Sequence, residues 1–460
     1  MCSSDLLIDS QKIDSNKITI IGSGETGISA ALLASKNGKK VFLSELNTEK
    51  IDGITKDNLT SKNIEFEIGE HSEKVFDSSL WVLSPGVPSD LDFVLKAKEM
   101  GILVISEIEF ASWYTKKPII GITGSNGKTT TVNLIQKILK SSHLDPVLAG
   151  NVGYAFSRAI LSDLNDEPKE RVYILELSSF QLENILDFKP MISVILNISP
   201  DHLDRHKNMD SYINAKLNIF KNQDERDYLV YNSNDSILSK KCQKALCRKI
   251  EFGLSKSSRS LLEKNGSKVY DNEIEVLNLN NALLKGDHNH LNILAAASAV
   301  KLLDVNNKII EKEVLSFSGI EHRMEKVISK NEITYYNDSK ATNIEAVIAA
   351  ISSFSSPVIL ILGGKDKDTD FSSLIPHIKL NVKRIISYGQ AGKKISIALR
   401  DAVELDQVFS LRDAVELCLK SAVPGDTVLL SPGCASFDQY ENFEERGNTF
   451  KRLVNKMAQA

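Results

Sequence analysis

The sequence predicts an α/β protein whose parallel sheets are buried on both faces. Apolar runs recur along the chain, and each is hydrophobic throughout rather than in alternation, as in strands that are covered on both sides. A glycine-rich or polar turn and a helix-like stretch follow each run, which is the order of βαβ units. The runs are Lys17–Gly22, Lys40–Glu45, Pro118–Thr123, Val172–Glu176, Ile192–Leu196, Pro357–Leu362, Lys383–Tyr388 and Thr427–Ser431.

The length of the chain and the positions of these runs predict three domains. A chain of 460 residues is longer than one ordinary domain. The first domain is expected over residues 1–106, because Gly101–Ile105 has the pattern of a closing strand. The second is expected over 107–319, and its stretch Asn222–Leu284 is polar with few strand signals. The third is expected over 320–460.

Composition argues against several classes of partner. The chain has 56 Lys and Arg against 60 Asp and Glu, a net charge of −4, and 42% hydrophobic residues. This is the balance of a folded protein and argues against a polyanion as its main partner, so no nucleic acid and no anionic membrane is expected as a partner, while a small anionic ligand stays open. No apolar run approaches the roughly 18 residues of a membrane span. Met1–Asp14 lacks the pattern of a signal peptide, and the five scattered cysteines suit a reducing compartment, so a cytoplasmic enzyme is expected.

The first domain opens with a turn that is typical of dinucleotide binding. Gly22-Ser-Gly-Glu-Thr-Gly27 matches GxGxxG between a strand and a helix, and Glu45 ends the next strand. In such turns the glycines approach a pyrophosphate and the acidic residue binds a ribose, which predicts a Rossmann-like domain. Ser84–Pro88, after the strand Leu80–Leu83, is expected to form another wall of this pocket. By itself the turn favours a nicotinamide oxidoreductase.

The second domain carries a loop suited to a nucleoside triphosphate. Gly121-Ile-Thr-Gly-Ser-Asn-Gly-Lys-Thr-Thr130 lies between an apolar strand and the helical run Thr131–Leu139. Backbone N–H groups of such a loop surround phosphates, Lys128 reaches the β- and γ-phosphates, and Thr129 can bind Mg²⁺. The loop is a variant, because the usual GxxxxGK[ST] pattern has glycine where this chain has Ile122. A dehydrogenase needs no such loop, so we expect a P-loop ATPase-like central domain and another diphosphate-bearing ligand in the first.

Two strands of the second domain deliver further candidate ligands at their carboxyl ends. Glu176 ends the strand that begins at Arg171, and His202 lies in Asn197–Arg205, after the next strand. Ligands of parallel sheets gather at this edge. Glu176 and His202 are therefore candidates for contact with a metal or a phosphate.

Three polar loops follow three apolar strands in the third domain, which is expected to be a second Rossmann-like α/β domain. The loops are Asn337–Asn343, Gly363–Asp370 and Ser431–Gln439. Together they predict a basic, hydroxyl-rich rim that suits a small dicarboxylate or phosphate.

With these motifs in this order, the sequence resembles the Mur ligases, the ATP-dependent amino-acid ligases of peptidoglycan synthesis. The resemblance spans essentially the whole chain, and the variant phosphate loop is the form that this family uses. Ser178–Leu182 and Asn337–Asn343 are similar to the member that adds D-glutamate. Further matching stretches are Gly150–Gly153, Asp201–Arg205, Tyr212–Lys216, His288–Asn289, His322–Arg323 and Ser431–Gln439.

The resemblance implies a role for individual residues. The catalytic residues would be Lys128, Glu176, His202 and Lys216. Two Mg²⁺ sites would use Thr129, Glu176, His202 and Lys216, the lysine as a carbamate formed with CO₂. ATP would contact Gly124, Ser125, Asn126, Gly127, Lys128, Thr129, Thr130, Asn289, Asn292, Arg323 and Asp338. The UDP-linked substrate would contact Glu25, Thr26, Ser44, Glu45, Gly86, Asn151 and His202. D-Glutamate would contact Thr342, Lys367, Ser436 and Phe443.

The resemblance also implies a reaction. A monomeric ligase would phosphorylate the carboxylate of UDP-N-acetylmuramoyl-L-alanine with ATP, and D-glutamate would then attack the acyl phosphate, releasing ADP and phosphate. Such an enzyme serves cell-wall biogenesis, and through it cell shape and cell division. The alternatives are a related Mur ligase that adds another amino acid, a folate polyglutamate ligase, a nicotinamide oxidoreductase and a non-catalytic nucleotide-binding module.

Overall fold

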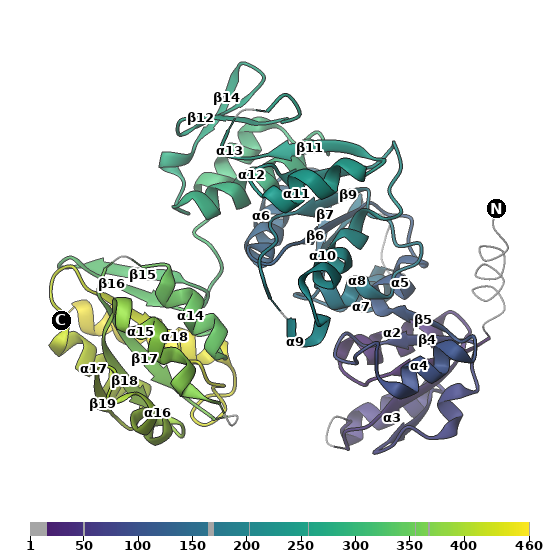
Figure 1. Ribbon diagram of the computed structural model, residues 1–460, viewed down its shortest axis with the longest axis horizontal. Helices are drawn as coiled ribbons and strands as arrows, with labels where there is room; N and C mark the ends of the chain where they lie inside the picture. Colours follow the sequence, from purple (N-terminus) through teal and green to yellow (C-terminus); the bar gives the residue numbers. More distant parts are fainter. Residues whose placement is uncertain are drawn as a thin grey trace. The chain divides into compact units, whose positions relative to one another are not determined.

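A computed structural model describes residues 16–48, 51–163, 170–201, 203–255, 257–354, 356–366 and 369–459 (Figure 1). The chain divides into two compact units, one ending at Phe317 and the other beginning at Ser318. The first two expected domains lie in the N-terminal unit, where each expected segment has its own parallel sheet. The α/β class predicted from the apolar runs is confirmed, whereas the domain limits at 106 and 319 stay predictions.

The first sheet has the strand order β3-β2-β1-β4-β5, and all its strands are parallel. Alternate residues of the strands face opposite sides: Ile18 and Ile20 pack under helix α2, while Ile21 and Trp81 pack under α4. The direction of winding reverses between β1 and β4, which is where ligands of such sheets bind. The elements are β1 (Lys17–Ile21), α2 (Glu25–Lys36), β2 (Lys40–Glu45), α3 (Gly53–Ser61), β3 (Glu65–Ile68), β4 (Leu80–Leu83), α4 (Asp92–Glu99) and β5 (Leu103–Ser106).

Helix α5 (Glu107–Ser112) connects the first sheet to the second. The buried carboxylate of Glu109 accepts hydrogen bonds from the backbone N–H groups of Leu186, Asp187 and Phe188, at 2.8 to 3.1 Å. Burying a carboxylate is costly unless its oxygens accept hydrogen bonds in this way. Glu109 therefore anchors the connecting helix to the second sheet.

The second sheet has the order β11-β10-β9-β6-β8-β7 and is parallel throughout. The polar stretch Asn222–Leu284, for which the sequence shows few strand signals, supplies two of these strands and a small antiparallel sheet, β12-β13-β14. Ile293–Val300 lies within a buried helix. The strands are β6 (Ile119–Thr123), β7 (Asp145–Gly150), β8 (Arg171–Glu176), β9 (Ile192–Ile195), β10 (Tyr228–Asn232), β11 (Arg248–Phe252), β12 (Glu263–Asn265), β13 (Lys268–Asp271) and β14 (Ile274–Asn278).

Helices cover both faces of the second sheet. Helices α6 and α12 pack over Ile120 and Ile122, while α7 and α10 pack on the opposite face against Tyr173 and Leu175. The helices are α6 (Lys128–Lys140), α7 (Phe156–Asp163), α8 (Ser179–Glu183), α9 (Leu203–His206), α10 (Met209–Leu217), α11 (Ser236–Lys241), α12 (Asp287–Lys301) and α13 (Asn307–Leu315).

The C-terminal unit contains a six-stranded sheet with the strand order β15-β16-β20-β17-β18-β19. Strand β15 pairs antiparallel with β16 at one edge, and the other pairs are parallel. The three strands that precede the polar loops, β16, β20 and β17, are direct neighbours. The elements are β15 (Glu325–Lys330), β16 (Ile333–Asn337), α14 (Ile344–Ser352), β17 (Val358–Gly363), α15 (Ile375–Asn381), β18 (Val382–Tyr388), α16 (Gly392–Leu399), β19 (Glu404–Gln407), α17 (Leu411–Ser421), β20 (Thr427–Leu430) and α18 (Phe443–Gln459).

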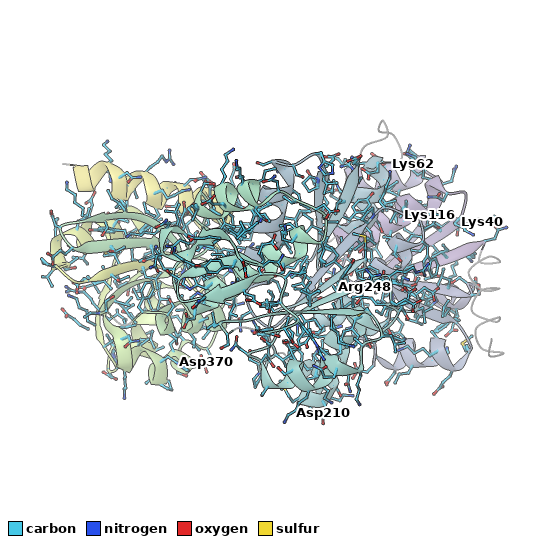
Figure 2. All side chains as sticks on the ribbon, turned by 90° about the horizontal axis from the view of Figure 1, so that it is seen from above. Lys40, Lys62, Lys116, Asp210, Arg248 and Asp370 are labelled. Carbon is cyan, nitrogen blue, oxygen red and sulfur yellow. The ribbon has the colours of Figure 1, made fainter. Side chains whose placement is uncertain are left out.

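Charged side chains lie on the outside of both units. Figure 2 labels exposed examples, among them Lys40 and Arg248 in the N-terminal unit and Asp370 in the C-terminal one. Among the described residues, no helix is both long and apolar enough to cross a bilayer.

Candidate functional site

The phosphate loop lies between β6 and α6, as the sequence predicts, but α6 begins at Lys128, three residues before the predicted helical run Thr131–Leu139. Gly127 caps the helix with φ +86°, a left-handed conformation that glycine adopts without steric cost. A Cβ on Gly127 would lie 2.3 Å from Oδ1 of Asn292, so this asparagine of α12 lies directly against the loop. Asn289 lies three residues earlier on α12, where its amide donates to the Lys285 carbonyl at 2.9 Å. Exposed N–H groups at a helix N-terminus favour an anion.

Two lysine side chains converge on one carbonyl of this loop. Nζ of Lys128 donates to the carbonyl oxygens of Gly124 and Ser125 at 2.7 and 2.9 Å. Nζ of Lys216, on α10, donates to the same Gly124 oxygen at 3.0 Å. Burial, and after it the charge of Lys128, lowers the pKa of Lys216 to about 7. Near pH 7, the buried Lys216 is therefore a neutral amine in a large fraction of the protein molecules.

Glu176 stands at the end of β8, beside the phosphate strand β6. Its side chain is 2% exposed, and Oε1 accepts a hydrogen bond from the Asn151 amide at 2.8 Å. Among the described residues Oε2 has no hydrogen-bond partner. A buried, unpaired carboxylate oxygen next to a phosphate loop suits a cation, because an uncompensated buried charge is costly. Thr129, 6% exposed at the first turn of α6, is the hydroxyl ligand expected of such a loop.

The residues fit Mg²⁺ bound jointly with phosphate. Nowhere in the described part of the chain do three His, Cys, Asp or Glu side chains form a metal-binding group. Mg²⁺ is commonly held by one or two carboxylates together with substrate phosphates, and Glu176 with Thr129 supplies that kind of partial site. His202, the remaining expected ligand, lies outside the described residues.

Two residues from other segments contact the phosphate loop, and the sequence motifs did not reveal these contacts. Asn197 lies two residues after the end of β9 and holds the loop. Its Oδ1 accepts from the Asn126 N–H at 2.8 Å, and its carbonyl accepts from the Ser125 N–H at 3.0 Å. The hydroxyl of Tyr212 lies 2.9 Å from Oγ of Ser125. The ring of Tyr212 also lies below Nζ of Lys216, 4.7 Å from its centroid. Tyr212 was part of a matching stretch, but no spacing rule gives it this contact.

The glycine-rich turn of the first sheet lies at the β1 carboxyl end, and Glu45 binds it from β2. The Glu45 carboxylate accepts from the N–H and hydroxyl of Ser23, both at 2.8 Å, and from the Asn47 N–H at 2.8 Å. Glu45 therefore holds the turn in place. Ser44 is buried, and its hydroxyl donates to Glu67 and lies 2.7 Å from Nδ1 of His71.

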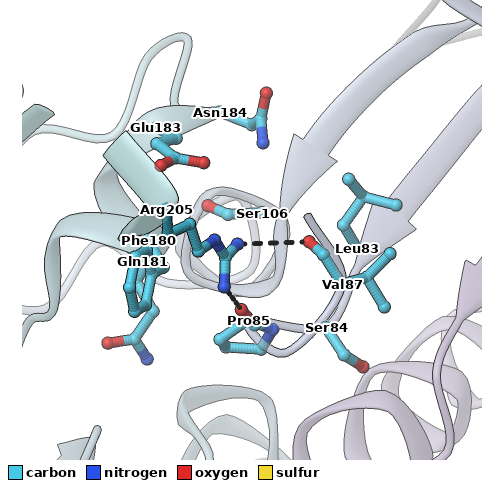
Figure 3. A pocket seen from close by; sticks show the side chains of 10 residues that line it. All are labelled: Leu83, Ser84, Pro85, Val87, Ser106, Phe180, Gln181, Glu183, Asn184 and Arg205. Atoms are coloured by element: carbon cyan, nitrogen blue, oxygen red, sulfur yellow. Dashed lines mark hydrogen bonds between the residues drawn. The ribbon is translucent and has the colours of Figure 1, made fainter. Parts of the chain in front are cut away.

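The other residues expected around the UDP-linked substrate lie near this turn or at the start of the second sheet. Glu25 and Thr26 begin α2, and Oε1 of Glu25 lies 3.3 Å from a guanidinium nitrogen of Arg158 on α7. Gly86 is exposed in the turn after β4, and Asn151 is exposed beside Glu176. A small pocket lies close to the Gly86 turn, between β4 and α8 (Figure 3).

The three polar loops of the C-terminal unit form one hydrogen-bonded cluster. Oγ of Ser431 donates to Asp338 at 2.8 Å, and the Lys365 N–H donates to the Ala435 carbonyl at 2.8 Å. Burial raises the pKa of Asp338 to about 6, against the opposing effect of its hydrogen bonds. The fully buried Arg446 of α18 donates to the carbonyls of Ser339 and Cys434, which ties the first loop to the third.

The remaining residues expected in this unit lie in or beside the cluster. Ser436 is 2% exposed, Thr342 and Phe443 are half-buried, and the Phe443 carbonyl accepts from Oγ of Ser339 at 2.8 Å. Arg323 is exposed near the start of the unit. Lys367 lies outside the described residues.

The comparisons with known proteins agree with this geometry. Three family models match along the chain: the MurD N-terminal domain over residues 17–92, the Mur ligase middle domain over 122–300, and the Mur ligase glutamate ligase domain over 322–434. Proteins named UDP-N-acetylmuramoylalanine–D-glutamate ligase are similar over nearly their whole length. The one from Christiangramia forsetii is 41% identical, covering 96% of this chain and 99% of the relative, and the one from Salinibacter ruber is 38% identical, covering 96% and 98%.

Solved structures share the fold. The MurF ligase of Thermotoga maritima in complex with ADP has a TM-score of 0.56 at 16% identity, covering 93% of this chain and 99% of that one. The UDP-N-acetylmuramate-alanine ligase MurC of the same organism has a TM-score of 0.54 at 19% identity, covering 96% and 99%. With a relative 41% identical along nearly the full length, the chain belongs to the Mur ligase family.

Proposed function

We propose that this protein is the ATP-dependent ligase that joins D-glutamate to UDP-N-acetylmuramoyl-L-alanine. The observation that carries the proposal is the convergence of Lys128 and Lys216 on the Gly124 carbonyl, beside the buried carboxylate of Glu176. This group can hold a triphosphate and a divalent cation at the edge of a sheet. The relatives named UDP-N-acetylmuramoylalanine–D-glutamate ligase support the choice of substrates.

The ATP site would be built on the phosphate loop. Gly124–Thr130 would surround the phosphates, and Asn292, which contacts Gly127, would border them. Asn289, Arg323 and Asp338 would contact the rest of the nucleotide. Lys128 is held by two loop carbonyls, and its ammonium would turn to the γ-phosphate when ATP arrives. Mg²⁺ would offset the negative charge as the phosphate meets a carboxylate.

Lys216 would act as a carbamate. Carbamylation requires a neutral amine, and the lowered pKa of the buried Lys216 provides one near pH 7. The product is an anionic group with two oxygens. It would give the metal site a second carboxylate-like ligand in addition to Glu176. The carbamate would exchange the repulsion between Lys128 and Lys216 for attraction. His202 is proposed as a further ligand.

The two remaining substrates would bind at the first sheet and at the sheet of the C-terminal unit. The turn Gly22–Gly27, with Glu25, Thr26, Ser44, Glu45, Gly86 and Asn151 around it, would bind the UDP-linked substrate. The C-terminal cluster would bind D-glutamate through Thr342, Lys367, Ser436 and Phe443. The buried Arg446 donates hydrogen bonds only to neutral oxygens among the described residues. Its positive charge would therefore attract the carboxylates of D-glutamate.

The reaction would proceed in two steps. A carboxylate is a poor electrophile in water, so its oxygen first takes the γ-phosphoryl group of ATP, with Lys128 stabilising the charge that develops. The amine of D-glutamate then attacks the acyl carbon, and phosphate leaves as the amide forms. We place this reaction in the cytoplasm and assign it to a monomer. The four described cysteines are buried as free thiols, which suits a reducing compartment.

The test is phosphate release with each substrate omitted in turn. Release is expected only when ATP, UDP-N-acetylmuramoyl-L-alanine and D-glutamate are all present, and mass spectrometry should find the product of amide formation. A panel of amino acids with L-glutamate as the matched control tests the choice of D-glutamate. Phosphate release that is independent of D-glutamate, or tight NADH binding without ATP binding, would refute the proposal.

A further inference from the structure

Arg205 joins the first and second sheets of the N-terminal unit, at the pocket shown in Figure 3. This half-buried residue lies on α9, near the second sheet. Its guanidinium donates from Nη1 to the Pro85 carbonyl at 3.0 Å and from Nη2 to the Val87 carbonyl at 3.3 Å. These two carbonyls flank Gly86. The guanidinium also stacks on Phe180 of α8, with 3.8 Å between Cζ and the ring centroid.

The turn that Arg205 holds is itself packed on the glycine-rich turn of the first sheet. Oγ of Ser84 donates to the Gly22 carbonyl at 3.2 Å, and the Ser84 N–H donates to the Ile21 carbonyl at 3.0 Å. A Cβ on Gly22 would lie 2.8 Å from the Ser84 hydroxyl oxygen, so the two turns are in close contact. The position of the Gly86 turn and that of the glycine-rich turn are therefore coupled.

On its other side Arg205 begins a chain of rings that reaches the phosphate loop. Phe180 stacks on the buried His206 with 5.2 Å between ring centroids, and His206 packs edge-on against Tyr212 at 5.3 Å. The Tyr212 hydroxyl lies 2.9 Å from Oγ of Ser125. His206 is fixed in turn, because its Nε2 lies 2.8 Å from the Ser179 hydroxyl. Close-packed rings of this kind transmit position because they leave little free volume.

We propose that Arg205 is a positioning residue for the uridine-linked substrate: it holds the Gly86 turn in register with the phosphate loop. The inference rests on the proposed function. Phosphoryl transfer needs the substrate carboxylate within reach of the γ-phosphate, and a misplacement of about 1 Å can cost about 100-fold in rate. Arginine suits the task because its planar guanidinium can stack on a ring while two separate nitrogens donate to two carbonyls; a lysine ammonium has no plane to stack and a single nitrogen.

The test compares Arg205→Lys with Lys207→Ala. Lys207 forms an ion pair with Asp90 at 2.8 Å and joins the same two segments, but both side chains are largely exposed, at 72% and 52%. An exposed pair contributes little, so this variant is the matched control. For each protein the measurements are the melting temperature, the calorimetric Kd values for UDP-N-acetylmuramoyl-L-alanine and for ADP, and the steady-state kcat and KM for each substrate.

Arg205→Lys is expected to lower kcat/KM for the uridine-linked substrate by about 100-fold and to weaken its binding. The Kd for ADP and the melting temperature should stay close to the wild-type values, because the contacts between Phe180 and Ser125 remain. Lys207→Ala should match wild type. Wild-type kinetics in Arg205→Lys, or equal losses for ADP and the uridine-linked substrate, would overturn the inference.

Three further outcomes have a defined meaning. If Arg205→Lys melts far below wild type, Phe180→Leu is measured in its place, because it removes the stacking surface and leaves both carbonyl hydrogen bonds of Arg205. Phe180→Leu should also lower kcat/KM for the uridine-linked substrate, and wild-type kinetics in that variant would overturn the inference. A wild-type protein that binds ADP but not UDP-N-acetylmuramoyl-L-alanine refutes the proposed function itself. Wild-type binding of both ligands with no effect of either variant refutes the role of Arg205 alone.

Discussion

Glu107 gives the stability of the N-terminal unit a pH dependence that one substitution should remove. This first residue of α5 is 1% exposed and lies where the helix meets the N-terminus of α7. Oε1 accepts from the Ser157 N–H at 2.5 Å, while Oε2 has no hydrogen-bond partner among the described residues. Burial raises the pKa of Glu107 from 4.5 to about 7; the Ser157 hydrogen bond opposes this and nearby Glu25 adds to it.

The magnitude and its sign follow from the pKa in the two states. At about 1.4 kcal/mol for each tenfold change in proton affinity, this difference corresponds to about 3 kcal/mol. The folded protein binds the proton more tightly than the unfolded chain, so the contribution is complete below about pH 4.5 and is lost as the pH rises through about 7. Glu107→Gln is neutral at every pH and cannot lose it.

The assay is urea unfolding at pH values from 4.5 to 8, followed by tryptophan fluorescence. The chain has two tryptophans, Trp81 in β4 and Trp113 just after α5, so the signal reports the N-terminal unit. The free energy of unfolding of Glu107→Gln relative to wild type should increase by about 3 kcal/mol over this range. Other titrating groups cancel in this difference, and so does any constant cost of burying the amide.

Parallel pH profiles for wild type and Glu107→Gln would refute the reasoning, because they would mean that Glu107 titrates alike in the folded and unfolded chain. Glu25→Gln serves as a companion variant. It removes a neighbouring charge that raises the pKa of Glu107, so the pH-dependent loss should become smaller without disappearing.

Three further predictions concern the nucleotide site. Lys216→Ala should lose most ligase activity and regain part of it with added acetate, which can replace the carbamate; full activity without acetate would contradict the carbamate role. Gly127→Ala should weaken ADP binding measured by calorimetry, because its Cβ would lie 2.3 Å from Oδ1 of Asn292 and the residue has φ +86°. The control is Gly24→Ala, which should bind ADP normally because Gly24 has φ −62° and no atom lies within 4 Å of its Cβ. Glu176→Gln keeps an acceptor for Asn151 but removes the charge, so the Mg²⁺ concentration for half-maximal activity should rise by about 10-fold or more, and an unchanged Mg²⁺ titration would show that Glu176 is not a ligand.

Several parts of the site could be predicted from sequence because their chemistry is local. The loop Gly124–Thr130 needs small residues, a lysine and a helix in immediate succession, and all three lie within one short stretch. The polar loops of the C-terminal unit each follow their own strand directly. Placing them together required only the rule that parallel strands present their carboxyl ends at one edge.

Other features depend on residues that are far apart in the chain. Asn222–Leu284 has weak strand signals because β11 lies at the sheet edge and its residues are only partly buried. Nothing in the sequence distinguishes Glu107 from other glutamates, because its raised pKa results chiefly from burial, which the packing of distant segments produces. Arg205 belongs to a matching stretch, but its two carbonyl partners lie more than one hundred residues earlier.

The sequence by itself determined the α/β class, the family and the order of the candidate loops along the chain, because periodicity and glycine spacing are properties of neighbouring residues. Only the tertiary structure decided which side chains share an atom. It placed Lys128 and Lys216 on the Gly124 carbonyl, and it left Oε2 of Glu176 buried without a described partner. Burial and Coulomb interactions act through space, so the chemical state of these groups is set by the packing of distant segments.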